Sequence, residues 1–186
     1  MKELAEKSYN RFDLFRNQWA VVTAGTIDNF NGCTVSWGSM GTLWTRGGET
    51  GDVITVYIHP GRYTCGFMEN SDTFTVSFFP NEYRKALGYV GTHSGRDEDK
   101  FSAAGLTPVE IGGSVGYKEA SVTFVCKKMY GASFDKAGLN EEIARYYKAN
   151  PKAYPVDENG DWQPHLMFVG EVVAVEEKLV FFIKCR

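Results

Sequence analysis

The sequence has 186 residues, of which 43% are hydrophobic and 23% charged, and its formal net charge is −3. This length and composition are typical of one globular domain, and we predict a single domain spanning residues 1–186. The slightly acidic balance argues against nucleic acid as a main partner, because proteins that bind nucleic acid normally present a basic face.

The cysteines and histidines do not form a metal site in the sequence. The four cysteines lie far apart without a C-x-x-C pair, and the three histidines are scattered, so no metal-ligand spacing is present. The N-terminal segment is charged and lacks an apolar signal core, and no apolar run approaches the roughly 20 residues of a membrane span. We therefore expect a cytoplasmic protein with reduced thiols, no membrane contact and no metal.

The first half of the chain is predicted to consist mainly of strands. A charged, partly helical lead-in over residues 1–17 should turn Leu14 and Phe15 inward. Strands are expected at residues 19–25, 31–37, 53–58 and 73–79, and residues 82–87 fit a short helix. Asn31-Gly32 is a strong turn signal, and residues 47–52 are predicted to form a polar loop.

The second half continues the pattern. Residues 94–101 form a charged segment, for which a solvated surface turn is the simplest explanation. Strands are expected at residues 107–111, 120–130, 165–175 and 179–183, with a turn at 112–114, an amphipathic helix over 141–147 and a tight hairpin at 176–178. Short strands without regular alternation with helices favour an antiparallel barrel or sandwich.

No side-chain constellation for catalysis is visible in the sequence. The chain lacks a G-x-G-x-x-G fingerprint, a P-loop, a G-x-S-x-G elbow and an H-E-x-x-H pair. No nucleophile stands beside an attendant base, so we predict no catalytic side chain. If the protein is an enzyme, its chemistry belongs to a bound cofactor.

The strand at residues 31–37 is unusually polar, and its small hydrogen-bonding side chains suit the edge of a flavin ring. Asn31, Thr34 and Ser36 could hydrogen-bond the ring of FMN, and Trp37 could cover it. Arg62 and Thr64 follow a buried strand and could bind the phosphate, since Arg is a good bidentate phosphate ligand. An exposed arginine after a proline turn is the alternative explanation of Arg62.

These segments together resemble the flavin reductase-like family, and within it the flavoredoxin branch. The resemblance rests on the order and spacing of five short pieces, which together extend from about residue 17 to residue 183. The pieces are Asn31 to Gly38, Arg62-Tyr63-Thr64, Phe74 to Ser77, Ser94-Gly95 with Asp99-Lys100-Phe101, and His165 with Glu171-Val172.

The resemblance implies a mainly β fold, an FMN-binding antiparallel split β-barrel of Greek-key type with short peripheral helices. It also implies a homodimer. The residues that it places at the cofactor are Asn31, Cys33, Thr34, Val35, Ser36 and Trp37 at the ring and ribityl chain, Arg62, Tyr63 and Thr64 at the phosphate end, and Ser94, Lys100 and His165 beside the pocket. Cys33 is expected to act as a small buried hydrophobe rather than a reactive thiol.

The leading hypothesis is an FMN-dependent oxidoreductase that transfers hydride or electrons between NAD(P)H, FMN and an acceptor that the sequence does not identify. The first alternative is an FMN electron carrier that exchanges electrons with a redox protein and turns over little NAD(P)H itself. The second alternative is a structural domain that has lost its flavin.

Overall fold

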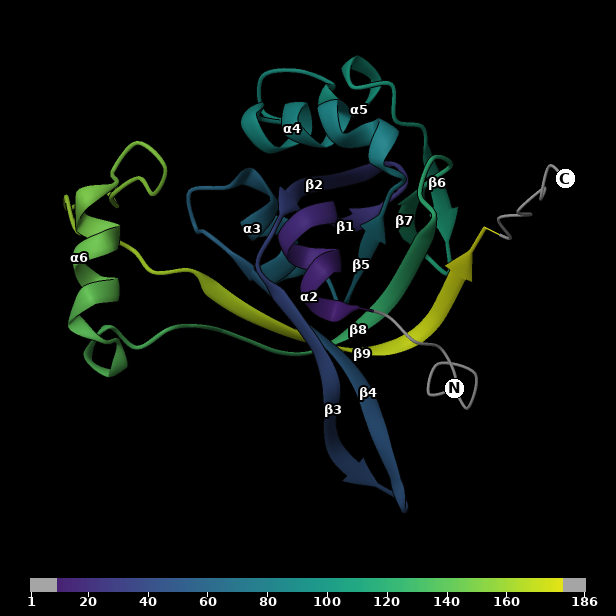
Figure 1. Ribbon diagram of the computed structural model, residues 1–186, viewed down its shortest axis with the longest axis horizontal. Coiled ribbons are helices and arrows are strands. Elements are labelled where there is room, and N and C mark those ends of the chain that lie inside the picture. Colours follow the sequence, from purple (N-terminus) through teal and green to yellow (C-terminus); the bar gives the residue numbers. More distant parts are fainter. Residues whose placement is uncertain (1–9, 179–186) are drawn as a thin grey trace, which may run out of the picture.

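The computed structural model describes residues 10–178 and shows a mainly β protein with a few short helices (Figure 1). The nine strands in this part of the chain are β1 (Ala20–Thr26), β2 (Asn29–Val35), β3 (Gly38–Arg46), β4 (Glu49–Ile58), β5 (Thr73–Phe78), β6 (Pro108–Ile111), β7 (Ser114–Tyr117), β8 (Val122–Ser133) and β9 (Leu166–Glu177). The α-helices are α2 (Arg11–Asp13), α3 (Tyr63–Asn70), α4 (Arg84–Thr92), α5 (Lys100–Ala103) and α6 (Glu141–Ala149). A π-helical turn (Leu14–Gln18) and two 3-10 turns (Asn81–Tyr83 and Lys136–Gly138) complete the set.

Seven strands form one antiparallel sheet in the order β2-β1-β5-β8-β9-β4-β3, and β6 and β7 form a separate hairpin. The predicted antiparallel, mainly β class is confirmed, whereas closure of this sheet into a barrel is not shown. In Figure 1 the β3–β4 hairpin projects from the body of the molecule, and α6 lies to one side, between β8 and β9 in the chain. None of the helices in the described range is long and apolar enough to cross a membrane.

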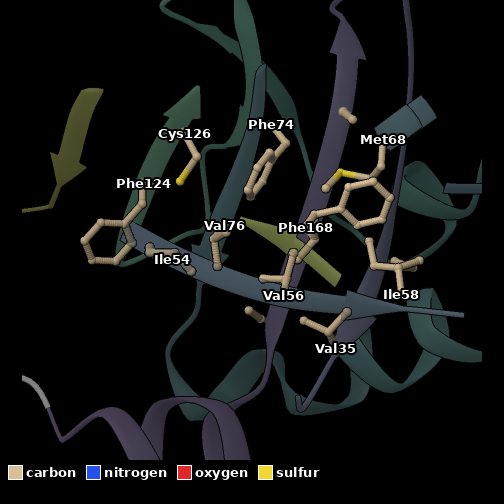
Figure 2. Packing of buried hydrophobic residues seen from close by; sticks show 14 of the residues in the cluster. Val35, Ile54, Val56, Ile58, Met68, Phe74, Val76, Phe124, Cys126 and Phe168 are labelled. Atoms are coloured by element: carbon tan, nitrogen blue, oxygen red, sulfur yellow. The ribbon is translucent and has the colours of Figure 1, made fainter. Parts of the chain in front are cut away.

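The main core is a cluster of buried side chains from the strands of the sheet and from α3 (Figure 2). Phe74, Phe168, Val76 and Val56 are almost completely buried there, together with Met68 from α3. A second cluster packs α4 and α5 against the other face of β1, where Val21 meets Leu87 and Phe101. β1 is therefore packed on both faces, and it holds its neighbour β2 in place.

Several predicted elements are confirmed, among them β5, the β6–β7 turn, α6 and the inward position of Leu14 and Phe15. The turn at Asn31-Gly32 is wrong, because both residues pair with β1 inside β2 and the chain reverses at residues 27–28. The loop predicted over residues 47–52 is also wrong beyond residue 48, since β4 begins at Glu49.

Two further differences concern helices and the C-terminal end. The helix α3 was not predicted, and the helix predicted over 82–87 is a 3-10 turn followed by α4, which extends to Thr92. The tight hairpin predicted at 176–178 is wrong, because β9 continues to Glu177. The strand predicted over 179–183 and the first nine residues of the lead-in lie outside the described residues.

Candidate functional site

Two adjoining pockets lie where β2, β4 and α3 meet, and they share Cys33 and Arg62. The aromatic pocket has a volume of about 290 Å³ and is lined by Cys33, Thr34, Val35, Ser36, Trp37, Tyr57, Ile58, His59, Arg62, Tyr146, Ala153, Tyr154 and His165. The basic pocket has a volume of about 150 Å³ and is lined by Cys33, Gly61, Arg62, Tyr63, Thr64, Val90, Thr92, His93, Ser94, Arg96 and Lys100.

The pockets form at element ends, where backbone groups are not used by the sheet. The end of β2 is fixed to α4 by a hydrogen bond from Thr34 Oγ1 to the Leu87 carbonyl at 2.6 Å. Pro60 and Gly61 end β4, and Arg62 is the N-cap of α3. The first amides of a helix have no intrahelical acceptor, so α3 directs free N–H donors and the positive end of its dipole at this corner.

The basic pocket gathers three cations without a carboxylate among the described residues that line it. Arg62 Nη1 donates to the Gly91 carbonyl at 2.8 Å, which uses one of the five guanidinium donors. Lys100 is 3% exposed, and its Nζ donates to the Val90 and His93 carbonyls at 3.2 Å each. Arg96 lies over the Tyr63 ring at 4.5 Å. Burial lowers the pKa of Lys100, and Arg62 acts in the same direction, while Cys33 and Glu98 oppose the shift.

Two buried polar atoms at this site have no hydrogen-bond partner within the described part of the chain: Asn31 Nδ2 and Thr64 Oγ1. Both residues are almost completely buried, and such groups are normally satisfied. The Cys33 thiol beside Thr64 offers only a weak acceptor. Gly95 allows a close approach to Asn31, because a Cβ at position 95 would lie 2.7 Å from Asn31 Oδ1. The two unsatisfied atoms indicate that a polar ligand belongs here.

The aromatic pocket is walled by flat side chains from three parts of the chain. The Trp37 ring lies 4.6 Å from the His165 ring and 6.2 Å from the Tyr154 ring, centroid to centroid. His59 packs edge-on against His165 at 5.3 Å. Trp37 is 41% exposed, so a flat apolar surface is available to a ligand.

Both pocket histidines are neutral near pH 7. Burial lowers the pKa of His165 to about 3, and the nearby His59 and Arg62 act in the same direction. Burial also lowers the pKa of His59, and Arg62 adds to the shift while the hydrogen bond to the Gln163 carbonyl opposes it. Among the described residues that line the aromatic pocket, Arg62 therefore carries the positive charge.

Cys33 is 3% exposed, and burial raises its pKa. The nucleophile and redox-active form of cysteine is the thiolate, which this environment disfavours. The structure therefore supports the interpretation of Cys33 as a small hydrophobe at the junction of the two pockets.

The residues present fit FMN. The basic pocket offers cations, hydroxyls and helix amides, which are the groups that bind phosphate. The aromatic pocket offers flat side chains for a planar ring. Thr64, with its unsatisfied hydroxyl, lines the basic pocket, and Asn31 lies against Gly95, between the lining residues Ser94 and Arg96.

The structure brings together the residues singled out in the sequence. Every one of the twelve except Asn31 lines one or both pockets, and Asn31 contacts the Gly95 segment beside them. The sequence did not reveal Arg96, because its charged segment resembles a solvated turn. It also did not reveal His59, Tyr146 and Tyr154. The density of aromatic residues between positions 146 and 162 was the available signal for the two tyrosines.

The family model described as "Flavin reductase like domain" matches residues 12–181. A search of curated proteins finds no match.

Solved structures with the same fold include three informative relatives. An FMN-binding protein from Thermus thermophilus with bound p-hydroxybenzaldehyde is 23% identical, with a TM-score of 0.60 over 86% of this chain and 71% of that chain. Flavoredoxin from Methanosarcina acetivorans is 16% identical, with a TM-score of 0.63 over 95% and 77% of the two chains. The NADH:FAD oxidoreductase from Streptomyces globisporus, in complex with NAD and FAD fragments, is 16% identical, with a TM-score of 0.58 over 87% and 74%.

Proposed function

The chain belongs to the flavin reductase-like family, and from this premise we propose that it is an FMN-binding oxidoreductase that transfers hydride or electrons between NAD(P)H, FMN and an acceptor. The observation that carries the proposal is the pair of unsatisfied buried atoms, Asn31 Nδ2 and Thr64 Oγ1, beside a cluster of cations without a carboxylate. FMN, when bound, supplies the hydride and electron chemistry.

In this proposal the two pockets divide the work of binding. Arg62, Arg96 and Lys100 neutralise the phosphate, and Thr64 and the first amides of α3 donate to its oxygens. Residues 33–37 and His165 hold the planar ring, and Trp37 covers it. Preorganised donors in a partly dry pocket also stabilise the negative charge of a reduced ring.

The seven-stranded sheet is interpreted as the split barrel of the family, since its edge strands β2 and β3 are consecutive in the chain. The homodimer and the cytoplasmic location stay predictions of the resemblance. A second candidate function is the FMN electron carrier, which the similarity to flavoredoxin from Methanosarcina acetivorans favours.

The first experiment is a titration of the purified protein with FMN, followed by flavin fluorescence. We expect saturable quenching at one FMN per chain. A sample without saturable quenching would refute the proposal and would favour the alternative of a structural domain that has lost its flavin. The holoprotein is then mixed anaerobically with NADH or NADPH. Rapid bleaching identifies a reductase, whereas bleaching only by a reduced redox protein identifies a carrier.

A further inference from the structure

His59 and His165 lie side by side in the aromatic pocket, but their hydrogen bonding differs. The Gly61 amide donates to His59 Nδ1 at 3.1 Å, and His59 Nε2 lies 3.1 Å from the Gln163 carbonyl. An amide can only donate and a carbonyl can only accept, so His59 carries its proton on Nε2. Both nitrogens of His59 are thus satisfied by the backbone.

His165 has a partner at one nitrogen. Its Nδ1 lies 2.7 Å from the Tyr147 hydroxyl, and its own backbone amide donates to the same hydroxyl oxygen at 3.4 Å. If Nδ1 also donated there, the buried hydroxyl proton would have no acceptor among the described residues. The arrangement in which Tyr147 donates to Nδ1 satisfies the buried hydroxyl proton and places the proton of the neutral ring on Nε2, which is not fully buried.

His165 Nε2 has no hydrogen-bond partner within residues 10–178, although the side chain is only 8% exposed and lines the aromatic pocket. This nitrogen is not fully buried, so its N–H is available to a ligand in the aromatic pocket that accepts a hydrogen bond. Tyr147 itself is 4% exposed and stacks on Trp162 at 5.7 Å, so its hydroxyl is held in a fixed position.

We propose that Tyr147 is a positioning residue that fixes His165 as the neutral Nε2–H tautomer, so that His165 donates a hydrogen bond to a carbonyl oxygen or ring nitrogen of a planar ligand in the aromatic pocket. This inference rests on the proposed function for the identity of that ligand, which we take to be the flavin ring. The low pKa of His165 agrees with it, because the ring stays neutral over the whole physiological range. A charged imidazolium would present both nitrogens as donors and would break the bond from Tyr147.

The tautomer is measured directly by NMR on protein labelled with 15N in its histidine rings. The chain has three histidines, so the signals are assigned by single substitutions. We expect His165 without FMN to show the Nε2–H pattern at pH 7, and FMN to shift the His165 Nε2 resonance. An Nδ1–H pattern for His165, or an Nε2 resonance that does not respond to bound FMN, would overturn the proposal.

Substitutions then separate positioning from packing. Tyr147→Phe keeps the ring and removes the hydroxyl, and we expect its His165 to lose tautomer selectivity and its FMN affinity to fall about five- to tenfold. Tyr130→Phe, at an exposed tyrosine of β8, is the matched control and should match the wild type. His165→Gln retains an N–H donor and should bind FMN within about threefold of the wild type, whereas His165→Leu should lose about tenfold or more.

The outcomes distinguish this proposal from the function on which it rests. A wild-type protein that binds no FMN refutes the proposed function and with it the ligand named here. A protein that binds FMN, but whose Tyr147→Phe variant retains both the wild-type tautomer and the wild-type affinity, refutes the role of Tyr147 alone.

Discussion

Replacing Arg62 with alanine should weaken FMN binding more than any other single loss of charge at the surface. Arg62 lines both pockets, and one of its five donors is used by the Gly91 carbonyl, so several N–H groups are available to a phosphate. A charge-assisted hydrogen bond is worth roughly 1.5–3 kcal/mol, which corresponds to an increase in Kd of about 10- to 150-fold. The assay is an FMN titration followed by fluorescence at constant ionic strength.

The variant should remain folded, because the Arg62 side chain is exposed and forms one hydrogen bond within the described residues. We expect the free energy of unfolding to fall by no more than about 1 kcal/mol. Arg16→Ala removes an equal charge from an exposed position outside both pockets and controls for net charge. Arg62→Lys keeps the charge without the planar fork and should give an intermediate Kd.

The salt dependence of binding provides a second measurement on the same variants. Exposed charges are screened by salt, so wild-type FMN affinity should fall as ionic strength rises, and this fall should be smaller in Arg62→Ala. If Arg62→Ala and Arg16→Ala bind FMN equally well and with equal salt dependence, Arg62 is not a ligand of the phosphate and the assignment of the basic pocket is wrong.

Three further predictions test the site and the fold. Thr64→Val removes an unsatisfied buried hydroxyl, so urea denaturation should show unchanged or slightly higher stability without FMN, while an FMN titration shows roughly a fivefold weaker Kd. His165 binds a proton more weakly in the folded protein than in the unfolded chain, whose histidine pKa is about 6.5. Between pH 6.5 and 3 the unfolded state therefore holds more protons, and His165 should lower the free energy of unfolding by up to about 2 kcal/mol from pH 6.5 to pH 5. Denaturation curves of His165→Gln should show a smaller slope, with the contribution of His59 left. Gly170→Ala should lower the free energy of unfolding by about 1–3 kcal/mol, because its Cβ would lie 2.5 Å from the buried Phe74 ring; Gly66→Ala, in open space on α3, should raise it by about 0.5–1 kcal/mol.

The sequence predicted the strands well where burial and residue type agree. Residues 53–58 and 73–79 combine β-branched or aromatic side chains with clear boundaries, and both are strands in the structure. The Asn31-Gly32 turn failed because pairing along the sheet outweighed a local preference: Ala24 pairs with Asn31 and Thr23 with Gly32. The Asn-Gly dipeptide alone does not reveal which strand will pair with it.

In the candidate site, too, some residues could be predicted from the sequence and others could not. The strand at 31–37 was identified because it has small polar side chains where a purely structural strand has apolar ones. The Arg62 segment was identified because arginine is a good phosphate ligand. Arg96 was not identified, because a charged segment has the same composition whether it faces solvent or a pocket. Its position follows from the packing of α4 and α5 on β1, which depends on contacts between residues far apart in the chain.

The position of Arg62 explains why the two pockets form one site. A phosphate and an aromatic ring need opposite surroundings, the first charged and hydrated, the second flat and apolar. The fold provides the charged half at the N-terminus of α3 and the flat half at the ends of β2 and β9. Arg62 lies between them, with one donor bonded to the Gly91 carbonyl.

The Arg62 guanidinium also lowers the pKa of His59, His165 and Lys100, so an anion bound beside it should raise all three pKa values. FMN binding is therefore expected to take up protons in the pH range where His59 titrates. Calorimetry of FMN binding in two buffers of different ionisation enthalpy would measure that uptake directly, and equal heats in both buffers would show that the anion does not bind next to Arg62.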